Sequence, residues 1–185
     1  MRYLFFIFLL LSFSSFSQNE GDIWYFGQNA GIDFNSGTAV PLSNGQLNTN
    51  EGCATICDNN GSLLFYTDGQ VVYNANHLLM PNGSGLTGHN SSSQSGVIVQ
   101  LPASSTIYYL FTVDGSSGVT GNGLFYSEID MSLNGGLGDI TANKNIMLFT
   151  NGDEKVTAIC HQNGSDFWIV GRVRHTNTYN SYLLT

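Results

Sequence analysis

The sequence predicts an all-β protein made of β-propeller-like repeats, each a four-stranded antiparallel meander. The composition is typical of a turn-rich chain, with 22 glycines, only three prolines, and abundant serine and asparagine. No stretch of ten or more residues combines helical spacing of apolar residues with helix caps. A pattern of short apolar strand, turn and aromatic strand occurs three times. We expect about three blades plus an N-terminal piece, which makes a partial or truncated propeller.

Each repeat is expected to begin with a hairpin. The apolar strands are 53–57, 96–99 and 156–160; the turns are 58–62, 102–105 and 162–165; and the aromatic strands are 63–69, 107–115 and 167–172. The first and third turns contain Asn-Gly, a strong hairpin signal because both residues tolerate a positive φ. The pattern therefore predicts three equivalent hairpins.

Further strands complete each unit. A third strand is expected at 71–73, 124–129 and 181–184, and an outer strand at 78–80 and 146–149. The N-terminal piece, 22–42, contains strand-like segments at 23–26 and 32–34. Phe65, Leu110 and Trp168 recur at intervals close to the roughly 40–50 residues of a propeller blade. The second interval is lengthened by insertions at 115–122 and 134–138.

A plain β-sandwich is the alternative fold, because it also has many short strands separated by turns. The equivalence of the three hairpins favours the propeller. Closed propellers have at least four blades. We therefore expect either a truncated chain or an open arc, whose strand edges are covered by missing C-terminal blades or by a partner.

Residues 1–17 are typical of a secretory signal peptide. Arg2 precedes an apolar run over 3–13, and small residues flank a cleavage point before Gln18. A membrane anchor is the alternative, but a spanning helix needs about 20 apolar residues, and no later stretch approaches that length. We expect residues 18–185 to form one propeller-like domain, incomplete at its C-terminus, that is secreted or lies at the cell surface outside the outer membrane.

Charge and cysteine content exclude several classes of function. With five Lys and Arg against 13 Asp and Glu, the net charge is −8, which argues against binding nucleic acid or an anionic membrane.

The three cysteines cannot all pair. Cys53 and Cys57 on one strand would lie about 13 Å apart, too far for a disulfide. Two alternatives remain for the cysteines. One is a Cys57–Cys160 disulfide, and the favoured one is that the cysteines are unpaired and serve as small buried residues on inner strands. No spacing suggests a metal site or a cofactor.

Four residues are candidates for ligand binding, and the favoured interpretation assigns no residue to catalysis. Asp68 and Asp114 each precede a glycine at the end of an aromatic strand, where they could line a ligand-binding face or cap a turn. His89 and Gln94 lie in the serine-rich segment 88–96, which lacks the Gly-x-Ser-x-Gly context of a nucleophilic serine. The turn 58–62 has oxygen ligands spaced like the start of a calcium loop, but a hairpin turn is favoured.

Several longer motifs resemble a known group of proteins. They are WYFGQNAGIDF at 24–34, EGCAT at 51–55, LFYTDG at 64–69, MPNG at 80–83, GHNSSSQSG at 88–96, SEIDM at 127–131 and LNGGLGD at 133–139. The chain from about Asp22 onward is similar to the N-terminal propeller-like region of large secreted Bacteroidota proteins. Those proteins continue into PKD-type domains and end in a type IX secretion sorting domain of the gliding-motility-associated kind. The resemblance implies export and a role in adhesion or surface interaction.

The function expected from the sequence is that of an exported, non-catalytic module that binds a glycan or protein ligand at the cell surface. The alternative is a secreted carbohydrate-active hydrolase using carboxylates such as Asp68 and Asp114. A structural spacer without any ligand is a third hypothesis.

Overall fold

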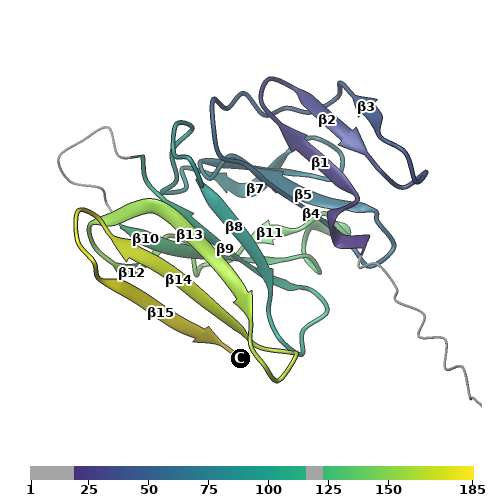
Figure 1. The fold of residues 1–185 in the computed structure, drawn as a ribbon. Helices are drawn as coiled ribbons and strands as arrows, with labels where there is room; N and C mark the ends of the chain where they lie inside the picture. Colours follow the sequence, from purple (N-terminus) through teal and green to yellow (C-terminus); the bar gives the residue numbers. More distant parts are fainter. Residues whose placement is uncertain (1–18, 116–122) are drawn as a thin grey trace, which may run out of the picture.

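The computed structural model describes residues 19–115 and 123–185 as four antiparallel β-sheets (Figure 1). The predicted signal peptide, 1–17, lies outside the described residues, as does most of the insertion at 115–122. The all-β prediction is confirmed. Two short 3-10 helices, η1 (Asn19–Gly21) and η2 (Asn134–Gly136), are the only helical segments among the described residues.

The strands follow the chain from sheet to sheet, and we number the sheets I to IV. Sheet I holds β1 (Ile23–Phe26), β2 (Ala30–Asp33) and β3 (Val40–Leu42). Sheet II holds β4 (Ala54–Cys57), β5 (Leu63–Thr67), β6 (Val71–Asn74) and β7 (Leu79–Ser84). Sheet III holds β8 (Gly96–Gln100), β9 (Ile107–Val113), β10 (Leu124–Asp130), β11 (Asp139–Ile140) and β12 (Ile146–Phe149). Sheet IV holds β13 (Gly152–Cys160), β14 (Phe167–Val173) and β15 (Tyr179–Leu184).

The repeated meander is present. All three hairpins, their third strands and both outer strands form where the pattern placed them, within a few residues. The outer position of sheet III is divided between two strands: β11 pairs with the Ile129–Asp130 end of β10, and β12 pairs with the Leu124–Tyr126 end. Sheets II and III are thus both four positions wide.

The turn after β4 confirms the hairpin interpretation and corrects its backbone geometry. The Asp58 N–H donates to the Ser62 carbonyl at 2.8 Å, and the Asp58 carboxylate accepts the N–H groups of Asn60 and Ser62, both at 2.9 Å. Gly61 has a φ of +80°, whereas Asn60 stays at negative φ. The expectation that Asn60 and Gly61 both take a positive φ was wrong, because the Gly61 N–H donates to the Asp58 carbonyl at 2.9 Å, so Asn59 and Asn60 are the central residues of the turn and Gly61 follows them.

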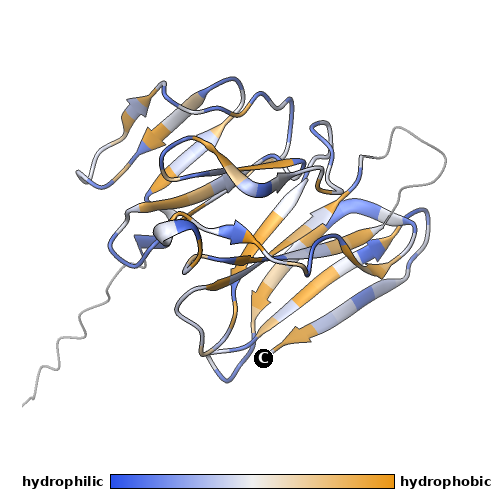
Figure 2. Cartoon of the chain, turned by 180° about the vertical axis from the view of Figure 1, so that it is seen from behind, coloured by the Kyte–Doolittle hydropathy of each residue, from blue (hydrophilic) through white to orange (hydrophobic). Residues whose placement is uncertain are grey.

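The sheets pack face to face in chain order. Adjacent residues of a strand point to opposite faces, so Phe65 of sheet II packs towards sheet III while Tyr66 packs towards sheet I. In the same way Leu110 of sheet III packs towards sheet II and Phe111 towards sheet IV. Three apolar layers therefore hold the four sheets of Figure 1 together, and apolar residues run along most strands in Figure 2.

All three cysteines are free thiols, so a Cys57–Cys160 disulfide is ruled out. Cys57 is fully buried, as expected for a small residue on an inner strand. Cys160 is exposed, contrary to that expectation, because it is the last residue of β13, at the end of the sheet.

Within residues 19–115 and 123–185, no helix has the length and apolarity needed to cross a bilayer.

Candidate functional site

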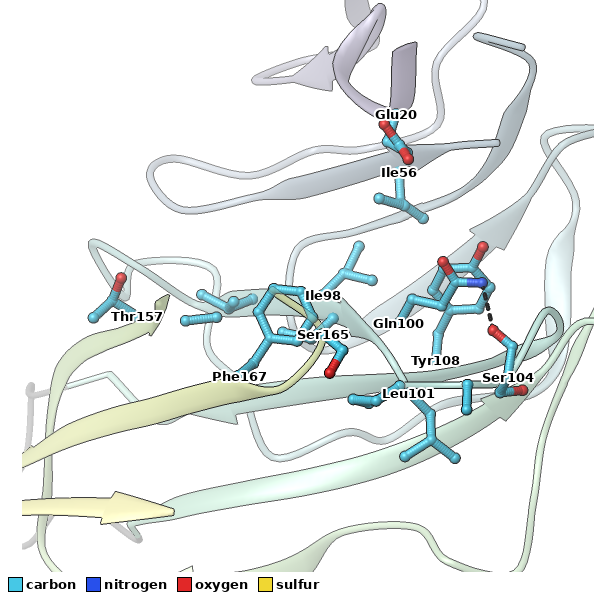
Figure 3. A pocket seen from close by; sticks show the side chains of 15 residues that line it. Glu20, Ile56, Ile98, Gln100, Leu101, Ser104, Tyr108, Thr157, Ser165 and Phe167 are labelled. Carbon is cyan, nitrogen blue, oxygen red and sulfur yellow. Dashed lines mark hydrogen bonds between the residues drawn. The ribbon is translucent and has the colours of Figure 1, made fainter. Parts of the chain in front are cut away.

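A large cavity lies where the first strands of sheets II, III and IV come together (Figure 3). Its volume is about 590 Å³, within the range of about 300–1,000 Å³ usual for small-ligand sites. Ile56 of β4, residues 97–100 of β8 and residues 157–158 of β13 form its walls, together with Glu20, Leu101, Pro102, Ala103, Ser104, Tyr108, Ser165 and Phe167. None of these residues is a lysine, arginine or histidine.

Gln100 is held in place by the turn that follows it. Its Nε2 donates to the Ser104 carbonyl at 2.8 Å, which fixes the orientation of the amide. The Ser104 hydroxyl in turn accepts the N–H groups of Thr106 at 3.3 Å and Ile107 at 3.0 Å. These hydrogen bonds hold the turn in one conformation, so the Gln100 amide has a fixed position beside the cavity (Figure 3).

Tyr108 supplies a hydroxyl on a rigid ring. The side chain is only 6% exposed, and its ring meets that of Phe65 edge-on, with centroids 5.7 Å apart. Burial raises the pKa of Tyr108, and the negative charges of Asp58 and Glu20 add to this effect. The phenol therefore stays protonated at neutral pH and keeps its O–H as a donor.

Glu20 stands on the opposite wall, beside Ile56 (Figure 3). It belongs to η1, which is tied to the β4–β5 turn by a 3.2 Å hydrogen bond from Asn19 Nδ2 to the Asn59 carbonyl. Its Oε2 is buried and has no hydrogen-bond partner among the described residues. Such an atom is costly to leave unpaired, and a polar hydrogen from a ligand or water would offset that cost.

Asp68 and Asp114, two of the residues singled out in the sequence, lie at the opposite end of the sheets, where β5 and β9 end. The Asp68 Oδ1 accepts the N–H groups of Gln70 at 2.9 Å and Val71 at 3.0 Å. The Asp114 Oδ1 accepts the Gly115 N–H at 2.8 Å. Both contacts favour the turn-capping interpretation of these carboxylates.

His89 and Gln94 lie at this same end. The His89 Nδ1 accepts the Ser91 N–H at 3.1 Å, and the ring lies so close to Gly115 that a Cβ built there would be 2.6 Å from Nδ1. The structure thus places His89 against Gly115, the residue that follows Asp114. Gln94 lines a separate cavity of about 230 Å³ with Lys155 and Arg172. None of the four predicted residues lines the 590 Å³ cavity, and their role in binding stays a prediction.

Only a weak sequence signal marks the residues that do line the large cavity. Gln100 is a polar residue at the end of an otherwise apolar strand, which could have marked it. Glu20, Tyr108 and Phe167 are far apart in the chain, and no local pattern connects them.

No protein family, curated protein or solved structure matches the chain in comparisons with known proteins. The geometry of this cavity is therefore the best guide to function.

Proposed function

We propose that the protein is an exported, non-catalytic, propeller-like module that binds a glycan at the cell surface, with one saccharide unit in the 590 Å³ cavity. The observation that carries this proposal is the lining of the cavity. It combines an amide held by a hydrogen bond (Gln100), a protonated phenol (Tyr108), a carboxylate (Glu20) and an aromatic ring (Phe167). Polar groups at fixed positions in a partly apolar hollow suit a neutral ligand that has both hydroxyl groups and an apolar face.

The propeller-like arrangement is supported by how the first strands meet. In a propeller, the innermost strands of successive blades surround a central channel. Here β1 lies beside β4, β4 beside β8, and β8 beside β13. Thr55 of β4 joins the first pair, because its Oγ1 accepts the Tyr25 N–H at 2.9 Å. The cavity lies among β4, β8 and β13, the position that the central channel has in a propeller.

Export and a role in adhesion are parts of the same proposal. They are supported by the signal-like segment 1–17 and by the resemblance to the N-terminal regions of secreted Bacteroidota proteins. The hydrolase alternative is less well supported, because the carboxylate of Asp68 already accepts two backbone hydrogen bonds and its residue is only 6% exposed.

The test is titration calorimetry with the polysaccharides that bind on a carbohydrate panel. We expect Gln100→Ala and Tyr108→Phe each to weaken binding about tenfold, since a lost hydrogen bond costs about 1.4 kcal/mol. Gln94→Ala is the matched control, because Gln94 belongs to the separate cavity, and it should leave the affinity unchanged. Loss of binding in Gln94→Ala but not in Gln100→Ala would overturn the assignment of the cavity. Release of shorter saccharides would favour the hydrolase.

A further inference from the structure

We propose that the saccharide unit in the 590 Å³ cavity is an amino sugar, whose protonated amino group pairs with the Glu20 carboxylate. This inference rests on the proposed function, since it names the class of glycan that the same cavity binds. It is carried by a buried carboxylate oxygen without a hydrogen-bond partner among the described residues, by a lining that lacks cations, and by the distribution of charge along the chain.

Glu20 is held on the cavity wall by the contacts of η1. On one side Asn19 Nδ2 donates to the Asn59 carbonyl at 3.2 Å, and on the other the Trp24 Nε1 donates to the Gly21 carbonyl at 2.7 Å. The Oε2 atom of Glu20 is buried and accepts no hydrogen bond from the described residues. Taking a carboxylate out of water without a partner is costly, and a cation beside the group offsets that cost. The ammonium group of a bound amino sugar is such a cation.

The rest of the lining offers hydrogen-bond acceptors and no cation. Figure 3 shows Glu20 across the cavity from Gln100 and Tyr108, whose side chains each contain an oxygen that can accept a hydrogen bond. An ammonium group has three N–H donors and no acceptor. None of the lining residues is a lysine, arginine or histidine. A carboxylated or sulfated sugar would therefore lack a positive partner here, whereas an amino sugar has both a carboxylate and neutral acceptors.

Asp58 adds to the negative field inside the cavity. Burial is the main cause of the raised pKa of Tyr108, and the carboxylates of Asp58 and Glu20 raise this pKa further. Both negative charges therefore act at the Tyr108 hydroxyl. A field that disfavours a phenolate favours an ammonium group at the same place.

The cations of the described chain lie away from this cavity. Residues 19–76 contain no lysine, arginine or histidine, and their acidic residues are Glu20, Asp22, Asp33, Glu51, Asp58 and Asp68. Lys155 and Arg172 line the separate cavity of about 230 Å³. Lys144 donates to two carbonyl groups of β7, and Arg174 follows β14 at the end opposite Phe167. The chain thus concentrates negative charge on the side of the cavity that Glu20 occupies.

The histidine of the turn after β13 lies beside the outer face of sheet IV. Ser165 of this turn lines the cavity, whereas the ring of His161 lies beside that of Trp168, with centroids 5.9 Å apart. Trp168 points to the outer face, because the adjacent Ile169 packs on sheet III. The same turn also contains the carboxylate of Asp166, which accepts the hydroxyl of Ser165 at 3.2 Å.

The experiment is titration calorimetry with three β-1,4-linked tetrasaccharides that differ only at carbon 2 of each unit. They are the oligomers of glucosamine, N-acetylglucosamine and glucose, which carry an ammonium, an acetamide and a hydroxyl group there. At pH 6, where the amine is protonated, we expect the glucosamine oligomer to bind at least about tenfold more tightly than the other two, because charge-assisted hydrogen bonds are the stronger ones. Added salt should reduce this preference.

Glu20→Gln keeps the size of the side chain and removes its charge. We expect this variant to bind the glucosamine oligomer about tenfold more weakly than the unmodified chain does, and so to lose the preference. Glu51→Gln is the matched control, because Glu51 is exposed and precedes β4 at the end of sheet II away from the cavity, and it should keep the preference. Circular dichroism checks that both variants are folded, and the ligand series tests the proposal on the unmodified chain as well.

Equal binding of the three oligomers, tighter binding of a neutral one, or a preference that Glu20→Gln retains would overturn the amino-sugar assignment and leave the proposed function in place. The same conclusion would follow if the chain bound a neutral glycan of the wider panel and not the glucosamine oligomer. Absence of binding to every saccharide would overturn both proposals. Gln100→Ala should weaken the binding of all three oligomers, which reports on the cavity independently of the amine.

Discussion

Cys57 shows how burial determines the chemistry of a single side chain. It ends β4 and has no exposed surface. Burial raises the pKa of its thiol to about 11, and the negative charges of Asp22 and Asp58 contribute. The thiolate is the reactive form of cysteine, so Cys57 is inert at neutral pH. Cys160 is exposed and open to reagents, and Cys53 is partly exposed.

The raised pKa predicts a loss of stability at alkaline pH. In the unfolded chain the thiol has its ordinary pKa of 9.0, so the unfolded state loses its proton first as the pH rises. The stabilisation is complete below pH 9 and is lost as the pH rises to about 11, by up to about 3 kcal/mol. Urea unfolding at pH 8 and pH 10.5 measures the loss.

The contribution of Cys57 is isolated by substitution. We expect Cys57→Ala to be less stable at pH 8, because it leaves a small void, and to lose less stability than the unmodified chain between the two pH values. Cys160→Ala should keep the full dependence on pH. An equal loss in Cys57→Ala and the unmodified chain would show that other groups cause it, Tyr66 among them, whose pKa burial raises to about 12.

At the scale of elements, the loop between β7 and β8 (residues 85–95) ties sheets II and III together at the end opposite the large cavity. The Gly88 N–H donates to the Gly69 carbonyl at 2.9 Å, and the Ser95 hydroxyl donates to the Gly52 carbonyl at 2.7 Å. These contacts leave no room for a side chain at Gly52, Gly69 or Gly88. A Cβ at Gly69 would lie 2.6 Å from the Ser95 carbonyl oxygen.

A comparison of two glycines distinguishes the stability cost of steric crowding from the cost of the backbone conformation. Gly69 and Gly85 both have positive φ, +85° and +71°, but nothing lies within 4 Å of a Cβ built at Gly85. We expect Gly85→Ala to cost about 1–2 kcal/mol, the strain of the left-handed conformation. Gly69→Ala should cost about 2 kcal/mol more, because the loop must also move. Urea unfolding of both variants gives the difference, and equal losses would mean that the loop yields easily.

A strand could be predicted from the sequence where the pattern that indicates it lies within a short stretch of the chain. The hairpins of sheets II, III and IV combine an apolar strand, a turn and an aromatic strand within about 20 residues. β3 was not predicted because it contains Pro41 and is mostly exposed, and β11 is only two residues long. The cavity escaped prediction because Glu20, Tyr108 and Phe167 meet only through the packing of sheets.

At the scale of the whole molecule, the packing predicts that the sheets unfold together. Sheet II has apolar contacts with sheets I and III, and sheet III with sheets II and IV. The loss of one sheet therefore exposes a core face of its neighbour, which opposes stepwise unfolding.

The two tryptophans of the chain allow this to be tested, because Trp24 lies in sheet I and Trp168 in sheet IV. In Trp24→Phe only the fluorescence of Trp168 remains, and in Trp168→Phe only that of Trp24. We expect the urea midpoint of each variant by fluorescence to equal its midpoint by far-UV circular dichroism. A fluorescence midpoint below that of circular dichroism would show that the end sheet in question unfolds independently.

The chain-order topology also affects the speed of folding. Almost every strand pairs with its sequence neighbour, β10 with β12 being the exception, so little loop entropy is lost in forming each sheet. Folding rates fall as the mean sequence separation of contacts rises. This protein should therefore fold faster than β-sandwiches of similar size, whose sheets pair distant strands. A chain emerging N-terminus first can form the strand pairs of sheets I and II while the rest is still being synthesised.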